Sequence, residues 1–214
     1  MLATLESSDE LRIAVLGDWF QDGAGPEALA ALAKVAEALG RGPTVSLPEA
    51  ARARAAAFCL TAAEGAALHL ADLRARPGDF DPGTRDRLLA GALLPSAVLI
   101  QAQRLRRWFQ ARAAELFERF DLLLAPATPC VAPFIGQTTL RLGDRDVLAR
   151  PNIGLYTQPI SFIGLPVVAA PVHPPNGMPV AVQLIARPWQ EETALRAAAR
   201  LERAGIVGAR IAAP

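Results

Sequence analysis

The chain has 214 residues, 52% of them hydrophobic, and a formal net charge of +1 at pH 7. A chain of this length and apolarity can bury a substantial core, so extensive disorder is excluded. Its near-neutral charge gives no global field for collecting phosphates, which argues against nucleic-acid binding. The cluster Arg104, Arg106 and Arg107 is interleaved with apolar residues at helical spacing, which indicates a solvated helix face.

Two cysteines, Cys59 and Cys130, are too few for a disulfide framework, and no basic-then-apolar segment opens the chain. Pro, Arg or Asp interrupts every apolar stretch before the roughly 18 residues that a bilayer span needs. We therefore expect a cytoplasmic protein with no membrane and no nucleic acid among its partners.

The N-terminal quarter of the chain predicts a strand, a helix and a second strand. Residues 1–10 are a polar tail, and residues 11–16 (LRIAVL) read as a short strand. Apolar residues then recur at helical spacing from Pro26 to a stop at Gly40, and residues 44–47 predict a second strand. Such a strand–helix–strand unit is expected to cross over in the right-handed sense.

The middle of the chain predicts helices followed by a buried strand. Residues 48–77 are alanine-rich and predict one long helix, with Gly65 as a candidate kink. A helical pattern resumes over residues 84–120, where Pro95 predicts a break between two helices. Residues 121–127 (DLLLAPA) are continuously apolar, as in a strand buried on both faces.

The last third predicts a hairpin near Gly143, a helix over 151–164, two strands and a terminal helix over 191–204. The strands, residues 166–172 and 179–186, flank the turn 174–177, which is short enough to make them antiparallel neighbours. The whole pattern predicts an α/β fold with a mixed β-sheet flanked by helices, and a single domain over 11–214.

No residue pattern supplies a catalyst. A nucleophilic serine needs a base in reach and an oxyanion hole, but no serine lies in a G-x-S-x-G or S-x-x-K pattern. Ser7 and Ser8 are adjacent but lie in the polar tail. The chain's one lysine, Lys34, lies on an amphipathic helix, which favours a surface position.

Other candidate groups favour structural roles. Cys130 follows an apolar strand, where catalytic groups often lie, but a lone cysteine is more often a small buried hydrophobe. His69 and His173 are far apart and lack the partner spacing of a metal site. We therefore expect neither a metal nor another cofactor.

Four blocks of the sequence resemble the amidase signature family, in family order. They are RDRLLAGALLPSAVLIQAQRLRRWF at 85–109, FDLLLAPATPCVAP at 120–133, TQPISFIGLPVVAAPV at 157–172 and GMPVAVQLIARPWQEETALRAAARLE at 177–202. Members of that family are serine hydrolases that cleave amide C–N bonds with a Ser, cis-Ser and Lys triad. The resemblance covers nearly the whole chain and implies the C-terminal half of the amidase signature fold.

The family's glycine- and serine-rich catalytic segment precedes the region that these blocks match. The resemblance therefore implies a C-terminal portion that furnishes one wall of a substrate cleft and contains none of the catalytic residues. Such a portion should expose an apolar patch, so we expect it to bind the missing N-terminal catalytic half or to self-associate. The alternative is a stand-alone ligand-binding or scaffolding domain derived from an amidase. An independent hydrolase that uses Cys130 is a third hypothesis.

The resemblance also implies substrate-binding residues. Arg87 matches an arginine with which glutamine-using members hold a substrate carboxylate, although a surface helix arginine is an equal alternative. Gly154 stands where those members place an aspartate for the substrate's α-amino group. The combination of NIGLYTQPISFIGLP at 152–166 with DFDPGTRDRLLAGALLP at 79–95 is most similar to the bacterial subgroup acting on biuret-like carboxylated ureas. Such small amides have a carboxylate and no α-amino group, which would suit Arg87 with Gly154.

Polar residues before Pro159 complete the predicted site. Tyr156, Thr157 and Gln158 could line the cleft, although helix capping or packing explains Thr157 almost as well. Gln183, in the last predicted strand, is expected to satisfy backbone groups between layers and not to touch the substrate.

Overall fold

A computed structural model describes residues 10–174 and 177–209. The predicted tail, apart from Glu10, lies outside the described residues, as do Ser7, Ser8 and the middle of the 174–177 turn. The chain falls into two compact units. The helical unit comprises Glu49–Ala111, and the sheet unit comprises the chain before and after it. The predicted single domain over 11–214 stays a prediction.

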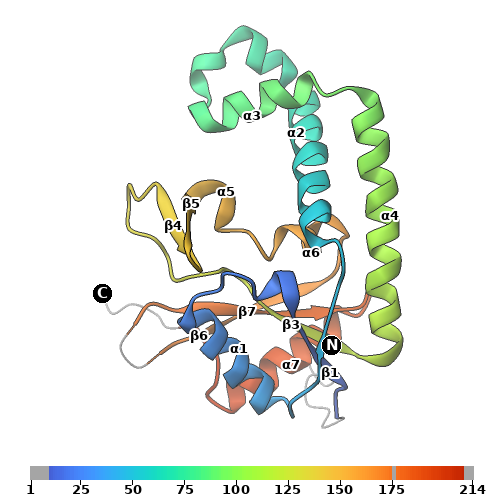
Figure 1. Cartoon of the computed structure of the whole chain (residues 1–214), viewed down its shortest axis with the longest axis vertical. Helices are drawn as coiled ribbons and strands as arrows, with labels where there is room; N and C mark the ends of the chain where they lie inside the picture. Colours follow the sequence, from blue (N-terminus) through green and yellow to red (C-terminus); the bar gives the residue numbers. More distant parts are fainter. Residues whose placement is uncertain (1–9, 175–176, 210–214) are drawn as a thin grey trace. The chain divides into compact units, whose positions relative to one another are not determined.

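The sheet unit is built on a mixed five-stranded sheet of order β2-β1-β3-β7-β6 (Figure 1). β1 pairs in parallel with both β2 and β3, whereas β7 pairs antiparallel with β3 and with β6. The predicted fold class is confirmed. The strands are β1 (Ile13–Leu16), β2 (Thr44–Val45), β3 (Leu122–Pro126), β6 (Val167–Val172) and β7 (Val180–Ala186).

Helix α1 (Pro26–Ala38) connects β1 to β2, after a short 3-10 turn η2 (Asp18–Phe20). Pro26 occupies the first turn, where its missing N–H costs nothing, and Gly40 follows the helix with φ 109°, a conformation that glycine adopts freely. The predicted strand–helix–strand unit is confirmed, with β1 and β2 parallel.

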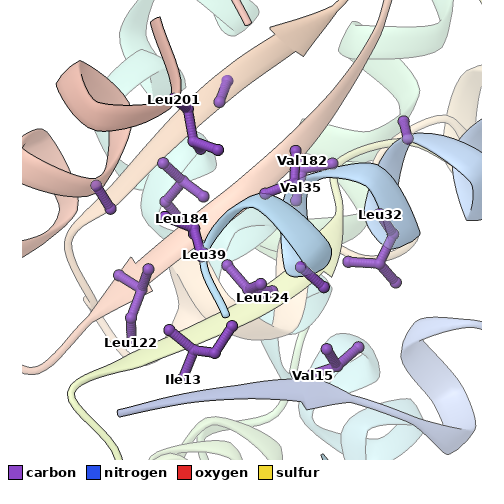
Figure 2. Packing of buried hydrophobic residues seen from close by; sticks show 14 of the residues in the cluster. Ile13, Val15, Leu32, Val35, Leu39, Leu122, Leu124, Val182, Leu184 and Leu201 are labelled. Atoms are coloured by element: carbon purple, nitrogen blue, oxygen red, sulfur yellow. The ribbon is translucent and has the colours of Figure 1, made fainter. Parts of the chain in front are cut away.

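The main core lies between the sheet and two helices, α1 and α7 (Glu191–Arg203). Alternate strand residues face these helices, because successive side chains in a strand point to opposite faces. Figure 2 shows side chains from β1, β3 and β7 gathered with those of α1 and α7. The labelled members are Ile13, Val15, Leu32, Val35, Leu39, Leu122, Leu124, Val182, Leu184 and Leu201.

The other face of the sheet is also buried, which explains the continuous apolar run of β3. All five β3 residues are buried. The peptide after the hairpin β4 (Thr139–Leu142) and β5 (Arg145–Leu148) contributes two short helices, α5 (Ala149–Asn152) and α6 (Gln158–Phe162). Figure 1 shows α5 and α6 on the side of the sheet opposite α1 and α7.

The helix predicted over 151–164 is therefore divided into two. Residues 153–157 form turns between α5 and α6. Pro159 explains the division, because its ring lacks an N–H and would clash with the carbonyl four residues before it in a continuous helix. In the structure Pro159 lies in the first turn of α6, where a proline is tolerated.

The helical unit contains α2 (Ala50–Ala75), the short 3-10 turn η3 (Pro77–Asp79), α3 (Pro82–Ala92) and the start of α4 (Ser96–Arg119). The predicted break at Pro95 is confirmed, and the chain turns by 100° there. α2 is one uninterrupted helix at Gly65. A Cβ at Gly65 would lie 2.6 Å from Leu88 Cδ2, so this glycine serves close packing of α3.

By length and composition alone, α2 could cross a bilayer, and so could the bent α3–α4 pair. One third of the apolar window of α2 is buried within the structure. Core helices of water-soluble proteins satisfy the same two criteria, so this is weak evidence for a membrane span.

An ion pair fastens the start of β3 to the residue before β1. Asp121 accepts hydrogen bonds from the Arg12 backbone N at 3.0 Å, from Nε at 3.1 Å and from Nη2 at 2.7 Å. The side-chain hydrogen bond from Arg12 is the largest cause that lowers the pKa of Asp121 below its ordinary value. The carboxylate is therefore favoured in the folded state.

This pairing predicts a pH-dependent contribution to stability. A carboxyl with a lowered folded-state pKa stabilises the fold above its unfolded pKa of about 4, and the contribution disappears as pH falls through the folded pKa. Asp121→Asn should therefore lower the urea midpoint of unfolding at pH 7. The further decrease of this midpoint as the pH is lowered below 4 should be smaller in the variant than in the wild type. The exposed Asp144→Asn variant is the control. A wild-type pH profile in Asp121→Asn would contradict the assignment.

Candidate functional site

Four of the predicted site residues, Gly154, Tyr156, Thr157 and Gln158, lie together at the α5–α6 junction of the sheet unit. Gln183 of β7 ties this junction to the sheet. Its Nε2 donates to the Pro126 carbonyl at 2.8 Å and to the Tyr156 carbonyl at 3.3 Å. Gln183 is 2% exposed, so the prediction that it satisfies backbone groups between layers is confirmed.

The Tyr156 side chain is fully buried. Its hydroxyl donates to the Asp22 carbonyl at 2.7 Å, across 134 residues of sequence. Burial, followed by the nearby Asp22 and Cys130, raises the pKa of Tyr156 above its ordinary value. The phenol is therefore neutral at physiological pH, and it anchors the segment after β1 to the α5–α6 junction.

Thr157 and Gly154 form a local turn before α6. Thr157 Oγ1 donates to the Gly154 carbonyl at 3.2 Å and makes no hydrogen bond to the start of α6. The Gln158 backbone N donates to the same carbonyl at 3.2 Å. A Cβ placed at Gly154 would lie 3.4 Å from Thr157 Oγ1, an ordinary contact, so the local packing does not demand a glycine there.

The carboxyl ends of the parallel strands β1 and β3 lie at the same edge of the sheet, where open α/β sheets commonly bind ligands. The segments that follow them meet there, since Gly25 N donates to the Pro129 carbonyl at 2.7 Å. Cys130 is half-buried, and burial followed by Glu27 raises its thiol pKa. A raised pKa reduces the thiolate fraction, so Cys130 has the character of a packed thiol.

Arg87, the predicted carboxylate-binding residue, belongs to the helical unit. It projects from α3, and its Nη2 donates to Thr61 Oγ1 of α2 at 2.5 Å. Its guanidinium carbon lies 5.2 Å from the centroid of the Phe58 ring. Arg87 itself is exposed and pairs with no carboxylate among the described residues. A guanidinium held by neutral groups keeps its charge available for an anion.

The two partners of Arg87, Phe58 and Thr61, were not predicted from the sequence. Arg54, Phe58 and Thr61 recur at i, i+4 and i+7, so they share one face of α2. The Arg54 guanidinium carbon also lies over the Phe58 ring, at 5.3 Å from its centroid. Large side chains at helical spacing in an alanine-rich helix indicate a face that packs against another element. They do not identify the residue on α3 that this face contacts.

In the sheet unit, Lys34 of α1 and His173 after β6 line one pocket together with apolar residues, whereas His69 belongs to the helical unit. Lys34 is exposed on α1, the His69 ring meets the Phe80 ring edge-on, and His173 Nε2 lies 2.7 Å from the Gly208 carbonyl. The described residues contain no group of three or more His, Cys, Asp or Glu that could hold a metal ion.

Comparison with known proteins identifies the family. A family model described as Amidase matches residues 2–195. The 1-carboxybiuret hydrolase subunit AtzE of Pseudomonas sp. (strain ADP) is 50% identical over 198 residues, covering 92% of this chain and 43% of that protein.

Two solved structures have the same fold as this chain. The first is an inhibitor-bound vestigial protein complex reported to reveal the evolutionary origins of an s-triazine catabolic enzyme. It matches with a TM-score of 0.91 at 48% identity, over 96% of this chain and 46% of that one. An amidase crystal structure matches at 0.81 with 24% identity, over 94% and 47%. The chain thus spans less than half the length of the proteins it matches.

Proposed function

This chain belongs to the amidase family, and from that premise we propose that it is the C-terminal portion of an amide hydrolase. Its role is to furnish one wall of the substrate cleft, while a serine-bearing segment furnishes the nucleophile. The reaction is hydrolysis of an amide C–N bond, in which water adds to the carbonyl carbon and an amine or ammonia leaves. By itself the chain is expected to be inactive.

The substrate that we propose is a small, carboxylated, urea-like amide. The observation that carries this proposal is that Arg87 is an exposed residue whose guanidinium pairs with no carboxylate among the described residues. A planar guanidinium binds a carboxylate through two parallel hydrogen bonds. Similarity to a 1-carboxybiuret hydrolase subunit supports the same substrate class.

Glycine at position 154 supports the proposal that the substrate has no α-amino group. An aspartate at this position would provide a counter-charge for an ammonium group, and the local packing leaves room for a Cβ. Glycine removes that counter-charge. We propose that Thr157 and Gln158 line the part of the cleft that the sheet unit contributes, while the buried Tyr156 fixes the backbone that presents them.

A partner for the sheet unit is part of the proposal. β6 pairs only with β7 among the described strands, and it forms one edge of the sheet with the apolar sequence VVAAPV. Val167 of this strand is exposed. An unpaired apolar edge is a template for another strand, which suits either the serine-bearing segment or a second copy of the chain.

A hybrid enzyme tests the function. In the hybrid, this chain replaces the segment of the Pseudomonas AtzE subunit that it matches. We expect the hybrid to release ammonia from 1-carboxybiuret and the chain alone to release none. A hybrid whose nucleophilic serine is replaced by alanine is the negative control.

Two outcomes would contradict the proposal. Ammonia release by the purified chain that survives Cys130→Ala would show that the chain carries its own catalyst. A folded hybrid that hydrolyses no carboxylated urea would favour the stand-alone binding domain.

A further inference from the structure

Arg87 is useful as a carboxylate clamp only if its guanidinium is held in place before the substrate arrives. Arginine has a long side chain with about 2 kcal/mol of rotamer entropy, and an unrestrained arginine would lose that entropy on binding. Arg87 lies on an exposed helix surface, so its orientation must come from specific contacts. The structure provides two such contacts, both from α2.

The first contact is the hydroxyl of Thr61. This hydroxyl donates its proton to the Ala57 carbonyl at 2.8 Å, one helical turn earlier, so its lone pairs are left to accept from Arg87 Nη2. A hydroxyl whose proton is already donated is a polarised acceptor, because linked hydrogen bonds strengthen one another. The contact occupies one donor nitrogen of the guanidinium and leaves the other N–H groups available.

The second contact is the face of the Phe58 ring, one turn of α2 before Thr61. The guanidinium carbon of Arg87 lies within cation–π distance of the ring centroid, at 5.2 Å. Ring and hydroxyl together restrict both the position and the rotation of the guanidinium. Neither partner carries a negative charge, so neither competes with an anionic substrate.

We propose that Thr61 and Phe58 are positioning residues that hold Arg87 ready to bind the substrate carboxylate. This inference rests on the proposed function, since Thr61 and Phe58 contact the proposed substrate-binding residue Arg87. Thr61 acts through Arg87 and is not expected to touch the substrate. Its loss should weaken recognition of the carboxylate and leave the bond-breaking step unaffected.

The kinetic test uses Thr61→Val in the hybrid enzyme, which replaces the hydroxyl with a methyl group of similar size. We expect the KM for 1-carboxybiuret to rise about threefold to tenfold, the fold-change that corresponds to a net hydrogen bond. We expect kcat to stay within about twofold, and the KM for uncarboxylated biuret to stay unchanged. Thr61→Ser restores the hydroxyl and should restore KM.

A double-mutant cycle distinguishes this inference from the proposed function. If Thr61 acts through Arg87, Thr61→Val should have no further effect on KM in an Arg87→Leu background. An unchanged KM in Thr61→Val, with a raised KM in Arg87→Leu, overturns the positioning role alone. An unchanged KM in both variants overturns the carboxylate site itself.

A second measurement uses the 214-residue chain without any activity. Side-chain ¹⁵N NMR of arginine guanidinium groups reports rotation about the Nε–Cζ bond, and Arg87→Leu assigns the Arg87 signal. We expect slower rotation for Arg87 than for Arg74, an exposed arginine of α2 with no hydrogen bond or ion pair among the described residues, with the difference lost in Thr61→Val and retained in Thr61→Ser. Free rotation of Arg87 in the wild-type chain overturns the inference.

Discussion

Replacing Arg87 with leucine in the hybrid enzyme should raise the KM for 1-carboxybiuret by about tenfold to a hundredfold. A hydrogen bond to a charged group contributes about 1.5–3 kcal/mol, and every 1.4 kcal/mol corresponds to a factor of ten. Among the described residues, Arg87 hydrogen-bonds to Thr61, lies over the Phe58 ring and forms no ion pair, so the substitution breaks no internal ion pair. Hydrolysis of uncarboxylated biuret should be unaffected.

Arg85→Leu is the matched control, because Arg85 lies on the same helix and pairs with Asp86 at 3.1 Å. Both variants remove one positive charge from α3, so any general effect of charge should appear equally in both. A KM that rises only in Arg87→Leu indicates specific recognition. An unchanged KM in Arg87→Leu, or an equal rise for biuret, would remove Arg87 from the substrate site.

Gly91→Ala should destabilise the helical unit by about 2 kcal/mol. A Cβ at Gly91 would lie 2.2 Å from the Ala62 carbonyl oxygen and 2.3 Å from its carbon, so the backbones of α2 and α3 would have to separate. Overpacking of this kind typically costs about 1–3 kcal/mol, and alanine recovers up to about 1 kcal/mol of helix propensity. Urea unfolding followed by circular dichroism measures the change.

Gly78→Ala is the control for this substitution. No atom lies within 4 Å of a Cβ built at Gly78, which is in the turn between α2 and α3. Its stability should remain within about 0.5 kcal/mol of the wild type. Equal stability of Gly91→Ala and Gly78→Ala would mean that α2 and α3 do not approach as closely as the structure has them.

The fold could be predicted well where apolar periodicity and breakers agreed. β1, α1 and β2 follow from an apolar run, a helical repeat and glycine or proline punctuation, all of them local signals. The helix expected over 151–164 was wrong in its continuity, because Pro159 lies in the first turn of a separate helix, α6. That error has a local cause that a stricter use of proline geometry would have found.

The candidate site was predicted less completely than the fold. Arg87, Gly154 and their neighbours came from resemblance to the family, and their roles in this chain stay predictions. Phe58 and Thr61 were not singled out, although they lie on the face of α2 that meets Arg87. Tyr156 was considered for the cleft, and the structure places its side chain entirely in the interior.

By itself the sequence determined the family, the strand–helix–strand start, the buried central strand and the helical layer. The family was identified from the resemblance of four sequence blocks. The strands and helices follow from residue types that recur at short spacing, which can be read along a chain. The tertiary structure alone decided that Thr61 holds Arg87, 26 residues away, and that Tyr156 anchors Asp22, 134 residues away. Periodicity indicates which face of an element is buried, but only packing decides what that face meets.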